Sequence, residues 1–181
     1  MENTQSEVKK NTRQTKPVTP RVNELVSSCK SVILATVNGE GAPNASYAPF
    51  ARIGNRFYIL VSFMSRHTRN LRDVGKVSAM FIEDEAGTRQ IYARDRLTLD
   101  VTTSEIKRGT PAWDEGIEKL KERHGKVLDI LVTLEDFIMI ELTPVTGSYV
   151  NGFGSAYYVS EQLEIVEHRN DVAHQRSESD N

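Results

Sequence analysis

The chain has 181 residues, of which 38% are hydrophobic and 27% are charged, and its formal net charge at pH 7 is −2. This length suits one folded domain with tails, and the near-neutral charge argues against a surface built wholly for nucleic acid. The single cysteine, Cys29, excludes an internal disulfide and a multi-cysteine metal site. No apolar stretch is long enough for a membrane helix and no secretory signal is visible, so we expect a cytoplasmic protein with no membrane or nucleic-acid partner.

The N-terminal half predicts a tail, a short helix and a meander of antiparallel strands. Residues 1–18 offer almost nothing to bury, so we expect a disordered tail that ends at Thr19-Pro20, a helix N-cap followed by proline. Asn38-Gly39 is a strong hairpin signal that closes a β-rich run. Strands are expected at residues 31–37, 42–50 and 56–63, followed by a helix at 64–74.

The C-terminal half adds further strands and a long helix. Strands are expected at 76–84, 89–101 and 136–144, and a helix is expected at 111–131. A glycine-broken extended segment at 147–159 ends the ordered body, and residues 160–181 are expected to form a polar tail. Six or so antiparallel strands with a few helices are typical of a mainly β, α+β domain whose sheet curls into a barrel, here expected over residues 19–159.

Alternation within 89–101 places Tyr92, Arg94 and Arg96 on one face of the predicted strand. Guanidinium groups on a rigid strand suit carboxylate or phosphate ligands, although such a face can equally be solvated without binding anything. The helix at 64–74 adds further basic groups, namely Arg66, His67 and Arg69. Together these groups predict a site for an anionic ligand with an aromatic or apolar body.

Asp136 shares its side of the predicted strand 136–144 with apolar residues, and a buried carboxylate requires a partner. It either points into water at a frayed strand end or accepts a hydrogen bond from an imidazole. The chain has four histidines: His67, His124, His168 and His174. The spacing of the last two does not predict zinc, so the residues alone indicate a barrel with a basic anion site.

Six segments occur in the order and spacing of a known family: ATVNGEGAPNASYAPF, SRHTRNL, SAMFIEDE, YARDRLTLD, LEDFIMIEL and NGFGSAYYVS. Through them the chain resembles the HugZ/HutZ-like haem-utilisation proteins, most closely the short HutZ-like branch, over roughly residues 20–176. The segment SRHTRNLRDVGKVSAMFIEDE also resembles the signature of the larger FMN-binding split-barrel superfamily that includes pyridoxamine phosphate oxidase. The resemblance implies an antiparallel split β-barrel with a few flanking helices.

The resemblance also implies a homodimer that binds haem between its subunits and opens it to a bilin with release of iron, haem being both substrate and cofactor. It assigns the axial iron ligand to His174 in the C-terminal tail, with His168 as the weaker candidate, and makes Asp136 the acceptor for the axial imidazole. The other groups expected near the haem are Arg66, His67, Arg94 and Arg96. Arg96 joins Asp136 and His174 as an expected catalytic residue. An electron donor or reductase and a haem-transfer protein are the expected partners.

Two alternatives stay open. A non-catalytic haem carrier or store would use the same site, and bilin formation with a reductant would separate it from an enzyme. An FMN-binding oxidoreductase is implied at the level of the superfamily, with the FMN phosphate on basic groups such as Arg66 and Arg69. A yellow protein with flavin absorbance would favour FMN, whereas haem uptake would favour haem.

Overall fold

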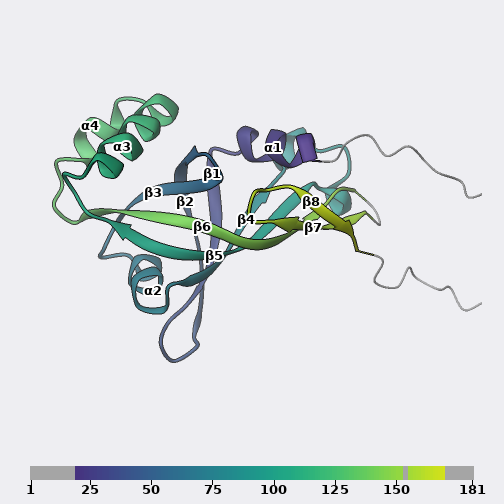
Figure 1. The fold of residues 1–181 in the computed structure, drawn as a ribbon, viewed down its shortest axis with the longest axis horizontal. Coiled ribbons are helices and arrows are strands. Elements are labelled where there is room, and N and C mark those ends of the chain that lie inside the picture. Colours follow the sequence, from purple (N-terminus) through teal and green to yellow (C-terminus); the bar gives the residue numbers. More distant parts are fainter. Residues whose placement is uncertain (1–18, 153–154, 170–181) are drawn as a thin grey trace, which may run out of the picture.

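The computed structural model describes residues 19–152 and 155–169 (Figure 1). Its strands are β1 (Ser31–Val37), β2 (Pro43–Ile53), β3 (Arg56–Ser62), β4 (Lys76–Ile82), β5 (Arg96–Ile106), β6 (Phe137–Val150), β7 (Ala156–Ser160) and β8 (Ile165–His168). Its α-helices are α1 (Thr19–Ser28), α2 (Arg66–Val74), α3 (Pro111–His124) and α4 (Val127–Leu131). Among these residues no helix has the length and apolar character needed to cross a bilayer.

All strands belong to one antiparallel sheet that closes on itself. Neighbouring strands follow the order β3-β2-β1-β4-β5-β6-β7-β8, and β3 also pairs with β6, so β1 to β6 form a closed barrel. β7 and β8 extend the sheet beyond β6, and α3 and α4 lie together at the opposite end of the molecule from them (Figure 1). The predicted mainly β, α+β split barrel is confirmed.

Two apolar clusters hold the barrel together, one on each side of β3 and β6. Inside the barrel, the fully buried rings of Phe50, Phe57 and Phe81 meet at centroid distances of 4.9 to 5.6 Å. Outside it, α3 and α4 pack on β2, β3 and β6, with Trp113 and Leu120 in the second cluster. Because both faces are covered where β3 pairs with β6, residues 57–61 of β3 and residues 137–142 of β6 are apolar except for Glu141.

One charged side chain is buried where β3 closes on β6. Glu141 of β6 accepts hydrogen bonds from Tyr58 Oη at 2.6 Å, from Arg56 Nη1 at 3.1 Å and from Thr143 Oγ1 at 3.1 Å. Burial and the bond to Glu141 raise the pKa of Tyr58 to about 12. Since Arg56 and Tyr58 belong to β3, these side-chain hydrogen bonds to Glu141 link β3 to β6 where the barrel closes.

The expected strand at 89–101 begins only at Arg96. Residues Ile91–Ala93 form a 3₁₀ turn instead, and the side chain of Gln90 caps this turn by accepting from Tyr92 N at 3.4 Å. The predicted strand is therefore wrong for residues 89–95, although polar and apolar residues alternate there. The Gln90 side chain takes up the main-chain N–H group of Tyr92, which a strand would use to pair with its neighbour.

Two other boundaries also differ from expectation. The helix expected at 111–131 is broken at Gly125, whose φ of 78° lies in the left-handed region that ends helices, so α3 and α4 are separate. The sheet continues beyond residue 159, where the tail was expected to begin, because β8 pairs with β7. The expected tail at 1–18 lies outside the described residues.

Gly147 permits a close approach of β6 to β5, and this generates a stability prediction. A Cβ at Gly147 would lie 2.5 Å from Leu99 Cδ2 and 2.8 Å from the Thr98 main-chain oxygen. Since the Thr98 carbonyl cannot rotate away, we expect Gly147→Ala to lower the free energy of unfolding by about 1–3 kcal/mol. Gly39→Ala, where an added Cβ meets nothing within 4 Å, is the control. Urea unfolding measures both variants, and equal stability would contradict the close approach.

Candidate functional site

The first group of predicted site residues lies where β3 ends and β6 begins. Asp136 is in the turn before β6, not in a strand as predicted, because the ladder with β3 starts at the pair Ser62–Phe137. Its Oδ2 accepts a hydrogen bond from Ser62 Oγ at 2.6 Å, and its main-chain oxygen accepts one from Phe63 N at 2.9 Å. Among the described residues, Ser62 is the only side chain bonded to this carboxylate, so Oδ1 can accept from a ligand or from another chain.

The helix α2 brings two more predicted residues to this end of the barrel, because Arg66 and His67 form its first turn shortly after Ser62. Arg66 is exposed, whereas His67 is half-buried and its Nε2 has no hydrogen-bond partner among the described residues. Burial lowers the pKa of His67, since the charged imidazolium is poorly solvated there. Phe63 and Met64 are 45% and 74% exposed and form an apolar rim beside these polar groups.

Arg108, which no sequence pattern singled out, holds the turn that carries Asp136. Its guanidinium donates to three main-chain oxygens of this segment, those of Val132, Leu134 and Phe137. It also lies over the ring of Trp113, 4.5 Å from the centroid. A planar group with five donors can satisfy several carbonyls at once, so Arg108 fixes the turn from outside while the end of β3 fixes it from within.

The second group of predicted residues lies at the other end of β6. Arg96 is exposed at the start of β5, where it pairs with Val150, the last residue of β6. Arg94 does not share a strand face with Arg96 as predicted, because it precedes β5 and turns back on its own chain. Its guanidinium donates to the Glu83 main-chain oxygen at 2.8 Å and to the Glu85 carboxylate at 2.9 Å. Those bonds occupy donors that the sequence assigned to a ligand.

The three histidines that the structure describes lie far apart, with His67 in α2, His124 at the end of α3 and His168 in β8. His168 lies in β8 at the second end, with its ring edge-on to Tyr157 at 4.9 Å. His124 closes α3 and its Nε2 lies 2.8 Å from the Phe50 main-chain oxygen, which is a packing role. His174 lies outside the described residues. Within the described ranges, no group of three or more His, Cys, Asp or Glu side chains could hold a metal ion.

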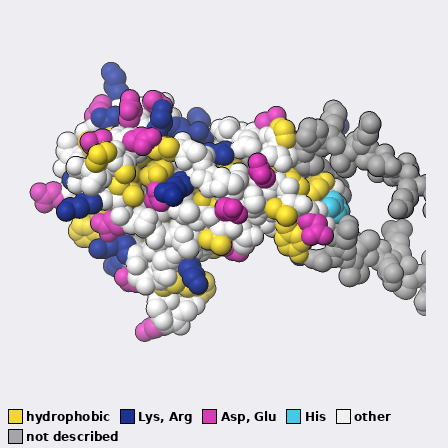
Figure 2. All heavy atoms as spheres, viewed as in Figure 1, with side chains coloured by type: hydrophobic (Ala, Val, Ile, Leu, Met, Phe, Trp, Pro, Cys, Tyr) yellow, Lys and Arg dark blue, Asp and Glu magenta, His cyan; other side chains and the backbone are white. Residues whose placement is uncertain are grey.

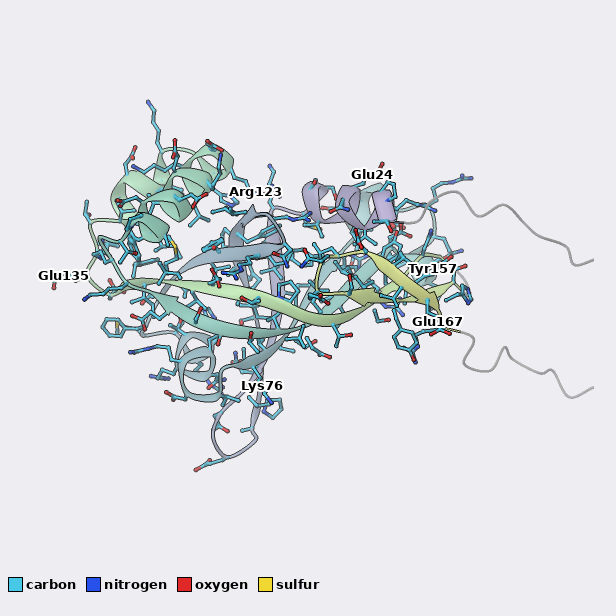
Figure 3. The ribbon with its side chains drawn as sticks, viewed as in Figure 1. Glu24, Lys76, Arg123, Glu135, Tyr157 and Glu167 are labelled. Carbon is cyan, nitrogen blue, oxygen red and sulfur yellow. The ribbon has the colours of Figure 1, made fainter. Side chains whose placement is uncertain are left out.

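One chain does not bring the two groups together. β6 begins opposite Ser62 and ends opposite Arg96, and its 14 residues span on the order of 40 Å. Figure 3 shows the separation, with Glu135 at one end of the molecule and Tyr157 and Glu167 at the other. The predicted residues therefore form two half-sites, with Arg66, His67 and Asp136 at the first end and Arg96 and His168 at the second. The structure adds Ser62 to the first half-site through its bond to Asp136.

The face of the molecule drawn in Figure 2 carries charges of both signs. Over the face seen in Figure 2, Lys and Arg side chains are interspersed with Asp and Glu side chains. An apolar hollow also crosses the outer face of β1, β4, β5 and β6, where its lining includes Ala35, Val37 and Val145.

Comparison with known proteins places this geometry in a family context. Residues 18–151 match the family model of pyridoxamine 5'-phosphate oxidase. The chain is 42% identical over 141 residues to the haem oxygenase HutZ of Vibrio cholerae serotype O1, covering 78% of this chain and 80% of HutZ.

Solved structures are similar over the same part of the chain. The crystal structure of HutZ from Vibrio cholerae, described as a haem storage protein, has a TM-score of 0.72 at 40% identity, covering 77% of this chain and 98% of that chain. The crystal structure of Campylobacter jejuni ChuZ has a TM-score of 0.74 at 32% identity, covering 79% of this chain and 59% of that chain.

The buried His67 makes stability depend on pH. Between its ordinary pKa of 6.5 and its lower pKa in the folded chain, the unfolded chain binds more protons, so the free energy of unfolding falls as the pH falls. We expect His67→Gln, which cannot titrate, to lose less stability than the wild type between about pH 7.5 and about pH 5. Urea unfolding at the two pH values measures the difference, and equal losses would contradict the lowered pKa.

Proposed function

Because the chain belongs to the pyridoxamine 5'-phosphate oxidase family and, within it, to the HutZ-like haem-utilisation proteins, we propose that it binds haem and opens the porphyrin to a bilin with release of iron. We propose that it does so as a cytoplasmic homodimer. The observation that carries this proposal is the carboxylate of Asp136, which is held by Ser62 through one oxygen and offers the other beside an apolar rim.

The residues present fit haem. The exposed Phe63 and Met64 suit the face of a macrocycle, and the exposed guanidinium groups of Arg66 and Arg96 suit its propionates. The described ranges hold no cluster of metal ligands. Haem iron carries the four nitrogen ligands of its macrocycle, so the protein would have to supply only an imidazole as a further ligand.

Chain length supports a site built from two subunits. His174 follows His168 by six residues, which span at most about 22 Å when fully extended. β8 is antiparallel to β7 and β7 to β6, so β8 runs away from the end that carries Asp136. A tail leaving His168 falls short of Asp136 in its own chain, on the order of 40 Å back along β6.

In the proposed homodimer, Asp136 of one chain meets His174 of the other chain. The apolar hollow across β1, β4, β5 and β6 offers a surface on which two chains can pack. His168, the weaker candidate for the axial ligand, lies in β8, also far from Asp136 of its own chain. If His168 were the ligand, it too would have to meet Asp136 of the other chain.

Each side chain then has a defined part. Haem, when bound, supplies the redox chemistry and is itself the molecule oxidised. His174 would hold the haem iron, and Asp136 Oδ1 would accept the other imidazole N–H, which would orient the ring and raise its basicity. Arg96 would donate to the bound ligand from the second half-site, and Arg66 and His67 would lie near it in the first half-site. Arg94 would be less available to it, because its guanidinium bonds Glu83 and Glu85. Electrons must come from a donor or reductase, and a haem-transfer protein would deliver the substrate.

Two alternative functions have specific support. A haem carrier would use the same groups without turnover, and the HutZ crystal structure is described as a haem storage protein. An FMN-dependent oxidoreductase is suggested by the family model and by Arg66 and Arg69, both exposed on the first turn of α2, where a phosphate could bind.

A haemin titration, followed by ascorbate under air, separates these functions. We expect a Soret band that saturates at about one haem per chain and bleaches to a bilin. His174→Ala should abolish the band, and Asp136→Ala should weaken haem binding by about 10- to 100-fold. His168→Ala is the matched control and should retain both binding and turnover. Binding without bleaching would favour the carrier, and a yellow protein that takes up no haem would favour FMN.

Mixed dimers test whether the site is shared. Consider a dimer of one Asp136→Ala chain and one His174→Ala chain. If each site takes Asp136 from one chain and His174 from the other, one site combines both intact residues and the other combines both substituted residues. We expect this dimer, isolated with two different affinity tags, to bind haem at one normal site, whereas each parent homodimer has none. A mixed dimer with no normal site, but one weakened site and one lost site, would place both residues in one chain and contradict the arrangement.

A further inference from the structure

The hydroxyl of Ser62 has a defined direction. Ser62 Oγ accepts a hydrogen bond from Met64 N at 3.2 Å and lies 2.6 Å from Asp136 Oδ2. The carboxylate has no proton to give when it is ionised, so the hydroxyl hydrogen must point at Oδ2. The result is a short relay from a main-chain N–H through the Ser62 hydroxyl to one oxygen of Asp136.

The closure of the barrel does not need this hydroxyl. The ladder between β3 and β6, including the pair Ser62–Phe137, is made by main-chain groups. The turn itself is held by Phe63 N, which donates to the Asp136 main-chain oxygen, and by the three bonds of Arg108. Replacing Ser62 by Ala therefore leaves these bonds of the turn in place. It removes the acceptor of Met64 N, which lies on an exposed residue that water can reach, and it frees the carboxylate to rotate about its side-chain bonds.

We propose that Ser62 is a positioning residue of the haem site, which holds Asp136 Oδ2 so that Oδ1 faces the axial imidazole supplied by the other chain. This inference rests on the proposed function. A carboxylate anchored through one oxygen meets the imidazole in one orientation and loses little conformational freedom on binding. Without the anchor, the bond to the imidazole N–H forms less often and holds the ring less firmly.

The first readout is haem retention in the reconstituted full-length protein. We expect Ser62→Ala to transfer its haem to excess apomyoglobin about tenfold faster than the wild type, the order of loss seen when a group that orients a metal ligand is removed. Ser62→Thr keeps a hydroxyl and should restore slow transfer. Thr103→Val is the matched control, because Thr103 Oγ1 also donates at 2.6 Å but bonds the Leu71 oxygen at the far end of α2.

The second readout is the iron–histidine stretching band of the ferrous protein. A weaker bond to the imidazole N–H gives the ligand less imidazolate character, so this band should move to lower wavenumber in Ser62→Ala and in Asp136→Ala alike. The double variant should match Asp136→Ala in both readouts, because Ser62 acts only through that carboxylate. Urea unfolding of each variant checks that the fold is retained.

The results distinguish a wrong role for Ser62 from a wrong proposed function. If Asp136→Ala changes both readouts and Ser62→Ala changes neither, or if the two effects add in the double variant, Ser62 is not a positioning residue although the haem site stands. If the wild type takes up no haem, or Asp136→Ala leaves both readouts unchanged, the proposed function is wrong and this inference is wrong with it.

Discussion

The pairing of β3 with β6 is the constraint on which the rest of the structure depends. It closes the barrel, covers both faces of the first part of β6, and places a satisfied Glu141 carboxylate at the seam. The same register sets Ser62 beside Phe137, and so brings the Ser62 hydroxyl to the carboxylate of Asp136. One ladder thus supplies both the stability of the barrel and the geometry of the first half-site.

The length of β6 then divides the predicted functional residues between two ends. β6 pairs with β3 at its start, with β7 at its finish and with β5 along nearly its whole length. It therefore cannot fold back on itself, and the groups at its two ends stay apart. This separation is the physical basis for proposing a site that two chains complete. A closed barrel with an apolar hollow on its outer face is suited to that arrangement, because packing two copies buries the hollow.

The family scaffold does not by itself choose the ligand. The same barrel matches a family named for an FMN enzyme, and its relatives include proteins named for haem. The choice lies in a few side chains. Arg66 and Arg69 would serve a phosphate, whereas a carboxylate offered beside an apolar rim is better suited to an imidazole bound to iron. Arg94 is less available than its sequence suggested, because Glu83 and Glu85 occupy its guanidinium.

The sequence by itself determined the features that depend on local periodicity and turn chemistry. It predicted the mainly β barrel, the strands up to β4, and the hairpin at Asn38, whose side chain accepts from Glu40 N and Ala42 N. It also selected Asp136 and Arg96 as residues of interest. It incorrectly placed Asp136 in a strand, because the register of the β3–β6 ladder starts β6 only at Phe137. It also incorrectly placed Arg94 on a strand face, because a 3₁₀ turn precedes β5 and the Arg94 guanidinium bonds the Glu83 main-chain oxygen. Competition between hydrogen bonds settles both features.

Only the tertiary structure decided which residues meet. Ser62 and Asp136 are 74 residues apart in the chain, and Arg108 reaches a turn that starts 24 residues later. No local pattern encodes such pairs, since they follow from the register of strands that pack around a common core. The separation of the two half-sites has the same origin. It depends on where each strand begins and ends in the closed sheet, and periodicity cannot specify those boundaries.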